Sequence, residues 1–358
     1  MTNSPARTNT ALLVIAIIVV LAALKAASAL VVPLLLATFI ATIASTPIRW
    51  LNRQKLFGRY RIPTWISVVL VLSTLILVLI GLSLVIVQVI REFQAEQVFY
   101  EERIRTIAAN IIRSAQSFGL TVSEDDLLSL FDPGRVFRLA GQTLQSVGQL
   151  LSNTFFILLT VIFILAEGAS LPRKLYHIFR QKNVSSDWLR QFGTKMNRYI
   201  AVKSTTSLLT GTSVTVVLML MGVDFAILWG LLAFLLNYIP NIGSVIAATP
   251  AVLITVVQLG FGPAFFVLFS YIAINVVIGA GIEPRFLGRT LGLSTLVVFL
   301  SLIFWGWMFG TVGMFLSVPL TMTAKIGFES RPSTEWIASL LGPAPRSNAV
   351  NSPVEPEA

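Results

Sequence analysis

The amino-acid sequence predicts an all-α, polytopic integral membrane protein. Of its 358 residues, 55% are hydrophobic and only 12% are charged, whereas soluble domains carry about 25% charged residues. The deficit is concentrated, because residues 11–48 contain a single charge, Lys25, and residues 204–282 contain only Asp224. A transmembrane helix needs about 20 apolar residues, and several runs of this chain reach that length. These features exclude an ordinary soluble domain.

The net charge of +10 is distributed as in a membrane protein. Basic residues gather at the ends of apolar runs: five lie in the loop 49–61, and eight lie in residues 171–203 against one acid, Asp187. Cytoplasmic loops of membrane proteins carry this excess of lysine and arginine, which also attracts anionic lipids. We therefore expect membrane lipids, and no nucleic acid, among the partners of the chain.

Metal, cofactor and common enzyme chemistry find little support in the sequence. It contains no cysteine and one histidine, His177, so thiolate sites and histidine-based metal clusters are excluded. A phosphate-binding Gly-Lys loop, a His-Glu-x-x-His pattern and a Gly-x-Ser-x-Gly elbow are all missing. We expect no catalytic site, no metal and no cofactor, and therefore neither an enzyme nor a pump with its own ATPase.

Residues 1–90 form the expected N-terminal transmembrane unit. Its predicted elements are a helical hairpin, a basic loop and one long apolar helix, at residues 8–24, 26–43, 49–61 and 63–90. The hairpin turns near Lys25, because its two helices together are too long for one span and long enough for two short ones. Pro63 opens the long helix at a position where proline is favoured.

A cleaved signal peptide is the alternative for the N-terminus. Arg7, the apolar run 11–24 and the small residues 27–29 imitate the regions of such a peptide. A second apolar run, residues 30–43, follows at once, so cleavage would leave a hydrophobic start. A retained hairpin is therefore favoured.

Residues 91–146 predict a helical insert on the extracytoplasmic side. They carry eight acids and six basic residues, and apolar residues recur at the spacing of an amphipathic helix. We expect a packed cap or an oligomer contact here in preference to a ligand-binding site. Residues 147–325 then form the transmembrane transport core, which contains the cytoplasmic basic segment 171–203. Residues 326–358 form a tail of low apolar content that we expect to be largely disordered.

Charge asymmetry predicts the orientation in a bacterial inner membrane. A cytoplasmic N-terminus places the basic loop 49–61 inside, residues 91–146 outside and the basic segment 171–203 inside, in agreement with the positive-inside rule. Two solutions remain for residues 226–258. If they cross fully, Arg285 lies outside, and if they form a re-entrant hairpin, it lies inside.

Two apolar segments in the C-terminal half are broken by proline or glycine, and paired interrupted helices are the best sequence pointer to a transport site. Unwound backbone at membrane depth is tolerated only where protein or a wet cavity satisfies it. The alternative is that these residues merely allow tight packing or kinks. The expected pathway residues at the two breaks are Asn237, Pro240, Asn241, Gly243 and Ser244, and Gly306, Gly310 and Gly313.

Asn275 and Glu283 are further pathway candidates in the span between the two breaks. Asn275 interrupts an apolar run two helical turns before Glu283, so the two side chains can share a face. Burial disfavours the charged form of a carboxylate, which would suit a proton-coupling group. Equally, Glu283 could meet water or pair at the surface with Arg285 or Arg289.

At these residues the chain resembles a family, the autoinducer-2 exporter (AI-2E) family of bacterial permeases. The resemblance covers roughly residues 10–330. Its motifs occur in order: Gly230-Leu231-Leu232-Ala233-Phe234 through Ile239-Pro240-Asn241-Ile242-Gly243, Glu283-Pro284 with Gly288, Leu291-Gly292-Leu293-Ser294, the run Ser301–Gly306, and Pro319-Leu320. One departure is Gly279-Ala280-Gly281, where the family pattern would place a polar residue such as Asn.

The resemblance implies a permease that exports autoinducer-2 or another small molecule, with about eight transmembrane helices. It also implies a homo-oligomer, expected to be a pentamer, and adds Ser301 to the pathway residues. Because no nucleotide site exists, we expect coupling to an ion gradient, with H+ or Na+ as the coupling ion. The runner-up is a sodium- or lithium-proton antiporter, and the rival from another class is a non-transporting membrane scaffold.

Overall fold

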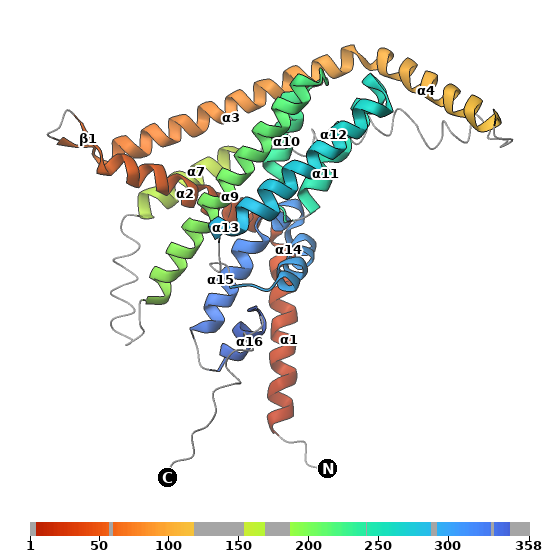
Figure 1. Cartoon of the computed structure of the whole chain (residues 1–358). Helices are drawn as coiled ribbons and strands as arrows, with labels where there is room; N and C mark the ends of the chain where they lie inside the picture. The colour runs from red at the N-terminus through yellow and green to blue at the C-terminus, as the bar shows by residue number, and fades with distance from the viewer. Residues whose placement is uncertain are drawn as a thin grey trace, which may run out of the picture.

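The structure of the chain is a computed structural model, and it is built almost entirely of helices (Figure 1). It describes residues 5–56, 60–117, 154–168, 187–240, 242–287, 292–330 and 333–343. The expected pathway residue Asn241, much of the insert 91–146, about half of the basic segment 171–203, and Arg289 lie outside the described residues. The prediction of an all-α membrane protein is confirmed. In the described part of the chain, the strands are limited to one hairpin of two strands, each two residues long.

The N-terminal unit consists of α1, α2, the hairpin β1–β2 and α3, and α7 packs against it. Their bounds are α1 Pro5–Ala26, α2 Ser28–Arg53, β1 Lys55–Leu56, β2 Tyr60–Arg61, α3 Thr64–Ala95 and α7 Thr154–Gly168. The first turn lies at Ala27, close to the expected position, but α2 continues to Arg53, so the first five residues of the expected basic loop are helical. Pro63 precedes the first residue of α3. Buried residues of α2, α3 and α7 form one small core.

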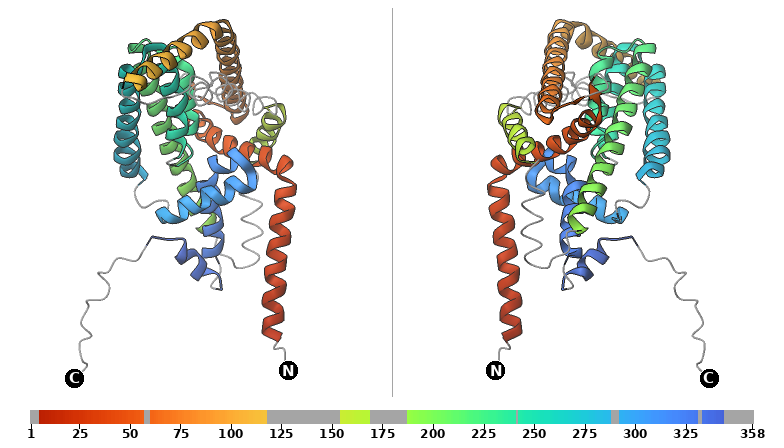
Figure 2. Two further views of the ribbon diagram at one scale, coloured as in Figure 1. Left: turned by 90° about the vertical axis from the view of Figure 1, so that its right-hand side faces the viewer. Right: turned by 90° about the vertical axis from the view of Figure 1, so that its left-hand side faces the viewer.

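Helix α1 stands apart from the rest of the described molecule, as both views of Figure 2 show. Its apolar side chains, including Leu12, Ile15 and Ile18, are more than half exposed. The contact that ties it to the C-terminal half is Lys25, whose Nζ atom lies 3.6 Å above the centroid of the Trp307 ring. In a membrane protein, a helix with this surface faces lipid or another apolar chain.

Helix α4, Gln97–Ser117, follows α3 after a single non-helical residue. It lies across one end of the helix bundle (Figure 1). Its buried side chains Tyr100 and Ile104 belong to the same core as α9, α10, α11 and α12. The described part of the insert is thus a helix packed on the helices of the bundle, and its role as an extracytoplasmic cap stays a prediction.

The C-terminal half contains α9 Asp187–Leu220, α10 Ala226–Leu236, α11 Ile242–Leu259, α12 Phe261–Ile274, the π-helix η1 Asn275–Ile282 and α13 Glu283–Leu287. It ends with α14 Thr295–Phe315, α15 Ser317–Glu329 and α16 Glu335–Leu340. Helix α9 joins the basic segment to the following span without a break, so Lys203 lies inside a 34-residue helix.

Helices α10 and α11 form a helical hairpin, and its two ends lie at the same end of the bundle. The Gln258 side chain, at the end of α11, accepts a hydrogen bond from the Asp224 backbone N–H (2.9 Å) and donates one to the Gly222 carbonyl (2.9 Å). Gly222 and Asp224 directly precede α10. Residues 226–258 thus leave the bundle at the end where they enter it, which is the path that the re-entrant alternative predicts.

Helices α14 and α15 form a second hairpin of the same kind. The Ser294 N–H, before α14, donates to the carbonyl of Leu341 (3.1 Å), and the Lys325 ammonium, near the end of α15, donates to the Gly292 carbonyl. The chain reverses at Gly310, whose φ of 65° interrupts α14. This hairpin opens beside α16, whereas the first opens beside α4, so the two enter from opposite ends (Figure 1).

The two hairpins meet inside the bundle through aromatic side chains. The ring of Tyr238, at the tip of the first hairpin, lies 4.6 Å from that of Phe315 in the second. Phe39 of α2 contacts both, at 6.0 Å from Tyr238 and 5.2 Å from Phe315. These residues join α9 in a shared core. The expected breaks therefore face each other across the middle of the protein.

Five helical stretches of the described chain are long and apolar enough to cross a membrane, and shorter apolar helices accompany them. The five are Ser28–Arg53, Thr64–Val89, Ile242–Leu259, Phe261–Phe286 and Thr295–Phe315. Two of them, in α11 and α14, belong to the re-entrant hairpins. Length alone therefore does not identify which helices pass from one side to the other.

Candidate functional site

The tip of the first hairpin is held against α9 by side-chain hydrogen bonds. The Asn237 Nδ2 atom donates to Ser207 Oγ (3.0 Å), and the Tyr238 hydroxyl donates to Ser204 Oγ (2.8 Å). Asn237 and Ser207 are both buried. An unpaired amide or hydroxyl at this depth would be costly, so these bonds fix the position of the tip on α9.

The sharpness of this tip depends on Gly243. A Cβ atom at this position would lie 1.8 Å from the carbonyl oxygen of Leu236, at the end of the opposite limb. The two limbs therefore approach each other more closely than any larger side chain allows. Pro240 and Ser244, also expected at this break, are half-buried on either side of the turn.

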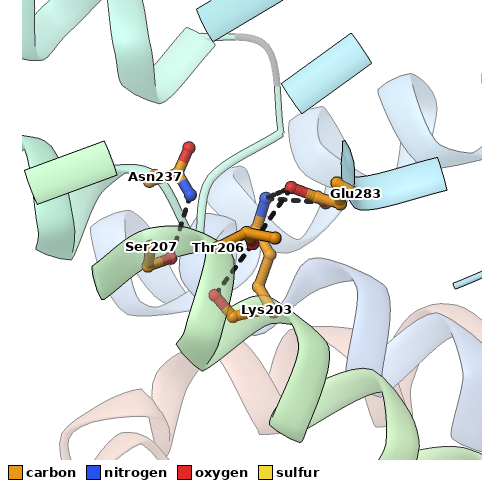
Figure 3. Close-up of polar contacts among 5 residues, drawn as sticks. All are labelled: Lys203, Thr206, Ser207, Asn237 and Glu283. Carbon is orange, nitrogen blue, oxygen red and sulfur yellow. Dashed lines mark hydrogen bonds and ion pairs between the residues drawn. The ribbon is translucent and has the colours of Figure 1, made fainter. Parts of the chain in front are cut away.

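Next to the tip, a buried ion pair joins α9 to α13. Lys203 Nζ lies 2.9 Å from each carboxylate oxygen of Glu283, and the Thr206 hydroxyl donates to Glu283 Oε2 at 3.3 Å (Figure 3). The side chains are 6% and 16% exposed. The pair and the Asn237–Ser207 contact lie side by side on one face of α9 (Figure 3).

Glu283 does not make the surface pair with Arg285 that the sequence left open, and Arg289 lies outside the described residues. The ion-pair partner of Glu283 within the described chain is Lys203 of α9, and the Arg285 side chain is exposed. A second link between the same elements is the hydrogen bond from Arg198 Nη2 to the Phe286 carbonyl (3.0 Å). Helix α13 is thus attached to α9 at two points.

Asn275 and Glu283 do not meet as the α-helical period predicted. The residues between them form the π-helix η1, in which hydrogen bonds span one residue more than in an α-helix. The Asn275 side chain lies beside Gly279, where an added Cβ would approach its Oδ1 atom to 3.2 Å. Glu283 instead turns towards α9, at the start of a five-residue helix.

The expected residues of the second break all contribute to its tight turn or its packing. A Cβ at Gly313 would lie 1.8 Å from the Trp305 carbonyl, and one at Gly306 would lie 2.8 Å from Met314 Cγ. Gly310 supplies the positive φ. Ser301 is buried, and its hydroxyl donates to the Val298 carbonyl of its own helix (2.8 Å). This break is therefore a packed corner.

Comparison with known proteins gives this architecture a family. Residues 12–331 match the family model described as AI-2E family transporter. The chain belongs to the AI-2E transporter family. It is 37% identical over 325 residues to the AI-2 transport protein TqsA of Escherichia coli (strain K12), covering 91% of this chain and 93% of that one. It is also 40% identical over 343 residues to a protein of Haemophilus influenzae named as a candidate transport protein, with 93% and 96% of the two chains covered.

In this AI-2E transporter the sequence prediction missed the α9 side of the site. Lys203 was counted with the basic segment, and Ser204, Thr206 and Ser207 were not singled out. A signal for them exists, since Lys203, Thr206, Ser207 and Thr210 are buried and recur at the spacing of one helix face. A polar stripe on an otherwise apolar helix indicates a face turned towards the protein interior.

Proposed function

We propose that this AI-2E transporter is a permease that exports autoinducer-2 or another small polar molecule, and that the substrate passes between the hairpin tips and the polar face of α9. The observation that carries the proposal is the meeting of two opposed re-entrant hairpins at a cluster of buried polar side chains. A bundle built only for stability gains nothing from such a cluster, because burying polar groups is costly. The names of the relatives support transport, and one of them names AI-2.

The test is flux of autoinducer-2 through the purified protein in proteoliposomes, with Asn237→Ala as the variant. The substitution removes the Nδ2 donor from Ser207 at the hairpin tip. We expect flux to fall at least about tenfold. A displacement of binding groups by about 1 Å can cost up to about a hundredfold in rate. The control is Asn52→Ala, because Asn52 Nδ2 contacts Thr64 near the β1–β2 hairpin, away from the tips.

Parental flux in Asn237→Ala would place the pathway elsewhere. If the parental protein reaches the membrane but carries neither autoinducer-2 nor any small molecule of a broad panel, the transport proposal is wrong and the non-transporting scaffold remains. The scaffold has no use for the buried polar stripe of α9, so we favour transport.

An ion gradient is the proposed energy source, with H+ or Na+ as the coupling ion. The partly buried carboxylate of Glu283 supports this proposal, because a charge largely removed from water needs a partner. The same pair favours a sodium- or lithium-proton antiporter as the second candidate. Proteoliposomes loaded with Na+ or Li+ and a pH-sensitive dye separate the two, since an antiporter moves protons without any organic substrate.

A homo-oligomer in the bacterial inner membrane completes the proposal, with a pentamer as the expected state. The exposed apolar surface of α1 supports such an assembly, because it offers contact area that the single chain leaves uncovered. The mass of the particle extracted in a mild detergent measures the number of copies.

A further inference from the structure

We propose that Lys203 is the binding site for an anionic group of the transported molecule, and that Glu283 occupies this site when the molecule is absent. The anionic group is a carboxylate or a phosphate of a small molecule that enters from water. This inference rests on the proposed transport function and adds the chemical class of its substrate.

The charges of the region single out this pair. Lys203 is the only basic residue in the sequence between Arg198 and Arg285, and Glu283 is the only acid between Asp224 and Glu329. Each is thus the single formal charge of its sign over a long apolar stretch. A buried ion pair is weak as a stabilising device, because desolvation offsets the attraction between the charges. Its presence here calls for another role.

The helices that carry the two charged side chains indicate which side chain the ligand would replace. Lys203 lies inside α9, whose hydrogen-bonded backbone continues on both sides of it. Glu283 begins the short helix α13 directly after the π-helix η1. Returning a π-helical turn to α-helix rotates the residues beyond it by about 100°. The lysine is therefore the fixed partner and the carboxylate is the movable one, so the ligand carries a negative charge.

The surroundings of Lys203 suit an anion on a polar molecule. The Thr206 hydroxyl lies 3.1 Å from the Lys203 carbonyl and 3.3 Å from Oε2 of the carboxylate that the ligand would replace, so it can donate to either. Ser207 and Asn237 follow on the same face of α9, and their hydroxyl and amide groups can bond to the uncharged part of a ligand (Figure 3). Lys203 itself is 5% exposed, so a lipid headgroup would have to carry its acyl chains into the protein to reach it.

The released carboxylate has a route to water. The Glu283 side chain is 16% exposed, and Arg285 and Phe286, on the same short helix, are exposed.

Chemical rescue tests the site without knowledge of the substrate. Glu283→Ala removes a CH2–COO⁻ group, which has the size and charge of acetate. In the purified full-length variant, acetate should raise the midpoint of thermal unfolding by roughly 2 °C or more at saturation. Acetamide, which has the same shape without the charge, should leave it unchanged. Sodium chloride at equal ionic strength accounts for screening.

Two variants show that a rescue belongs to Lys203. In Lys203→Met combined with Glu283→Ala, acetate should have no effect because the cation is gone. In Glu329→Ala, which opens the partly exposed Lys325–Glu329 pair (3.5 Å), acetate should again have none. Equal responses to acetate and acetamide in Glu283→Ala, or an acetate response that persists without Lys203, would overturn the proposal.

A second readout applies if Glu283→Ala is poorly folded. Acetate present from membrane extraction onwards should then increase the yield of monodisperse protein several-fold over acetamide, and equal yields count against the anion site. Neither readout requires flux. A chain that takes up acetate at Lys203 but exports nothing retains its anion site and loses the proposed transport function, so the two failures are distinguishable.

Discussion

At the scale of single residues, α9 and the first hairpin pack backbone to backbone. A Cβ at Gly230 would lie 1.7 Å from Thr215 Oγ1 and 2.7 Å from the Gly211 carbonyl, and a Cβ at Gly211 would meet the Gly230 carbonyl at 2.7 Å. Small residues at facing positions allow this approach between membrane helices. The contact sets how deeply the hairpin lies against the polar stripe of α9.

Gly230→Ala should therefore destabilise the protein. The added methyl group has no space, and overpacking of this kind costs about 1–3 kcal/mol. Gly81→Ala is the matched control, since Gly81 lies in α3 with nothing within 4 Å of its added Cβ, and alanine in a helix gains roughly 0.5–1 kcal/mol over glycine. Thermal unfolding in detergent measures both, and a Gly230 variant as stable as the parent would refute the close approach.

The site itself was only partly predictable at this scale. Asn237, Gly243 and Gly310 were found because a polar or helix-breaking residue in an apolar run is visible locally. The partner of Glu283 was not found, because Lys203 lies 80 residues earlier in the sequence. Its charge also continues a basic segment, which hid a buried residue among exposed ones.

At the scale of elements, α4 is fastened to the mouth of the first hairpin by Tyr100. This side chain is fully buried, and its hydroxyl donates to Asp224 Oδ2 at 2.6 Å. The Asp224 backbone bonds in turn to Gln258 and to the Trp229 indole. The hydrogen bonds around Asp224 thus connect α4, the start of α10 and the end of α11, and they hold the two limbs of the hairpin together.

Tyr100→Phe should lower the free energy of unfolding by about 1.5–3 kcal/mol, because this is the usual contribution of a hydrogen bond to a charged group. Burial, followed by the hydrogen bond and charge of Asp224, holds the pKa of Tyr100 well above its ordinary value. The folded protein therefore keeps this proton more tightly than the unfolded chain, whose tyrosines titrate near pH 10. The difference in unfolding free energy between parent and variant should be constant from pH 7 to about 9 and should shrink above about pH 10. A difference that already changes below pH 9 would contradict it.

The length of the apolar runs predicted most of the helices, but it did not predict where each helix begins and ends. The expected helix from Pro63 appears as α3, and both breaks in the C-terminal half lie where glycine and proline placed them. The π-helix η1 was not expected from the sequence, and the residues that follow it contact Lys203 and Arg198, which lie 80 and 88 residues earlier. The return of the hairpins likewise depends on distant contacts such as Asp224–Gln258.

At the scale of the whole molecule, the two hairpins open towards opposite ends (Figure 1). The end with the β1–β2 hairpin carries Arg49 and Arg53 beside the exposed Trp50 and Trp65, as is typical of a cytoplasmic membrane boundary. The re-entrant path of α10 and α11 returns Arg285 to the side of the basic segment, in keeping with the same rule. The orientation with a cytoplasmic N-terminus remains a prediction.

Single cysteines test this orientation, since the natural chain contains none. Gln54→Cys lies at the β1–β2 end and Asn110→Cys lies on α4, and both positions are exposed. In intact inner-membrane vesicles of right-side-out orientation, an impermeant maleimide should label Asn110→Cys and should label Gln54→Cys only after permeabilisation. The reverse pattern would invert the protein in the membrane.

The re-entrant form of the first hairpin also constrains how the protein is made. Helix α10 has 11 residues, about 16 Å of helix, which is too short to be inserted as an independent span. Its tip carries the polar side chains of Asn237 and Tyr238, which hydrogen-bond to Ser207 and Ser204 of α9. The outer side of the hairpin is covered by α12, through the buried Val267 and Tyr271. We therefore expect the hairpin of residues 226–259 to reach its final position only once both α9 and α12 are in place.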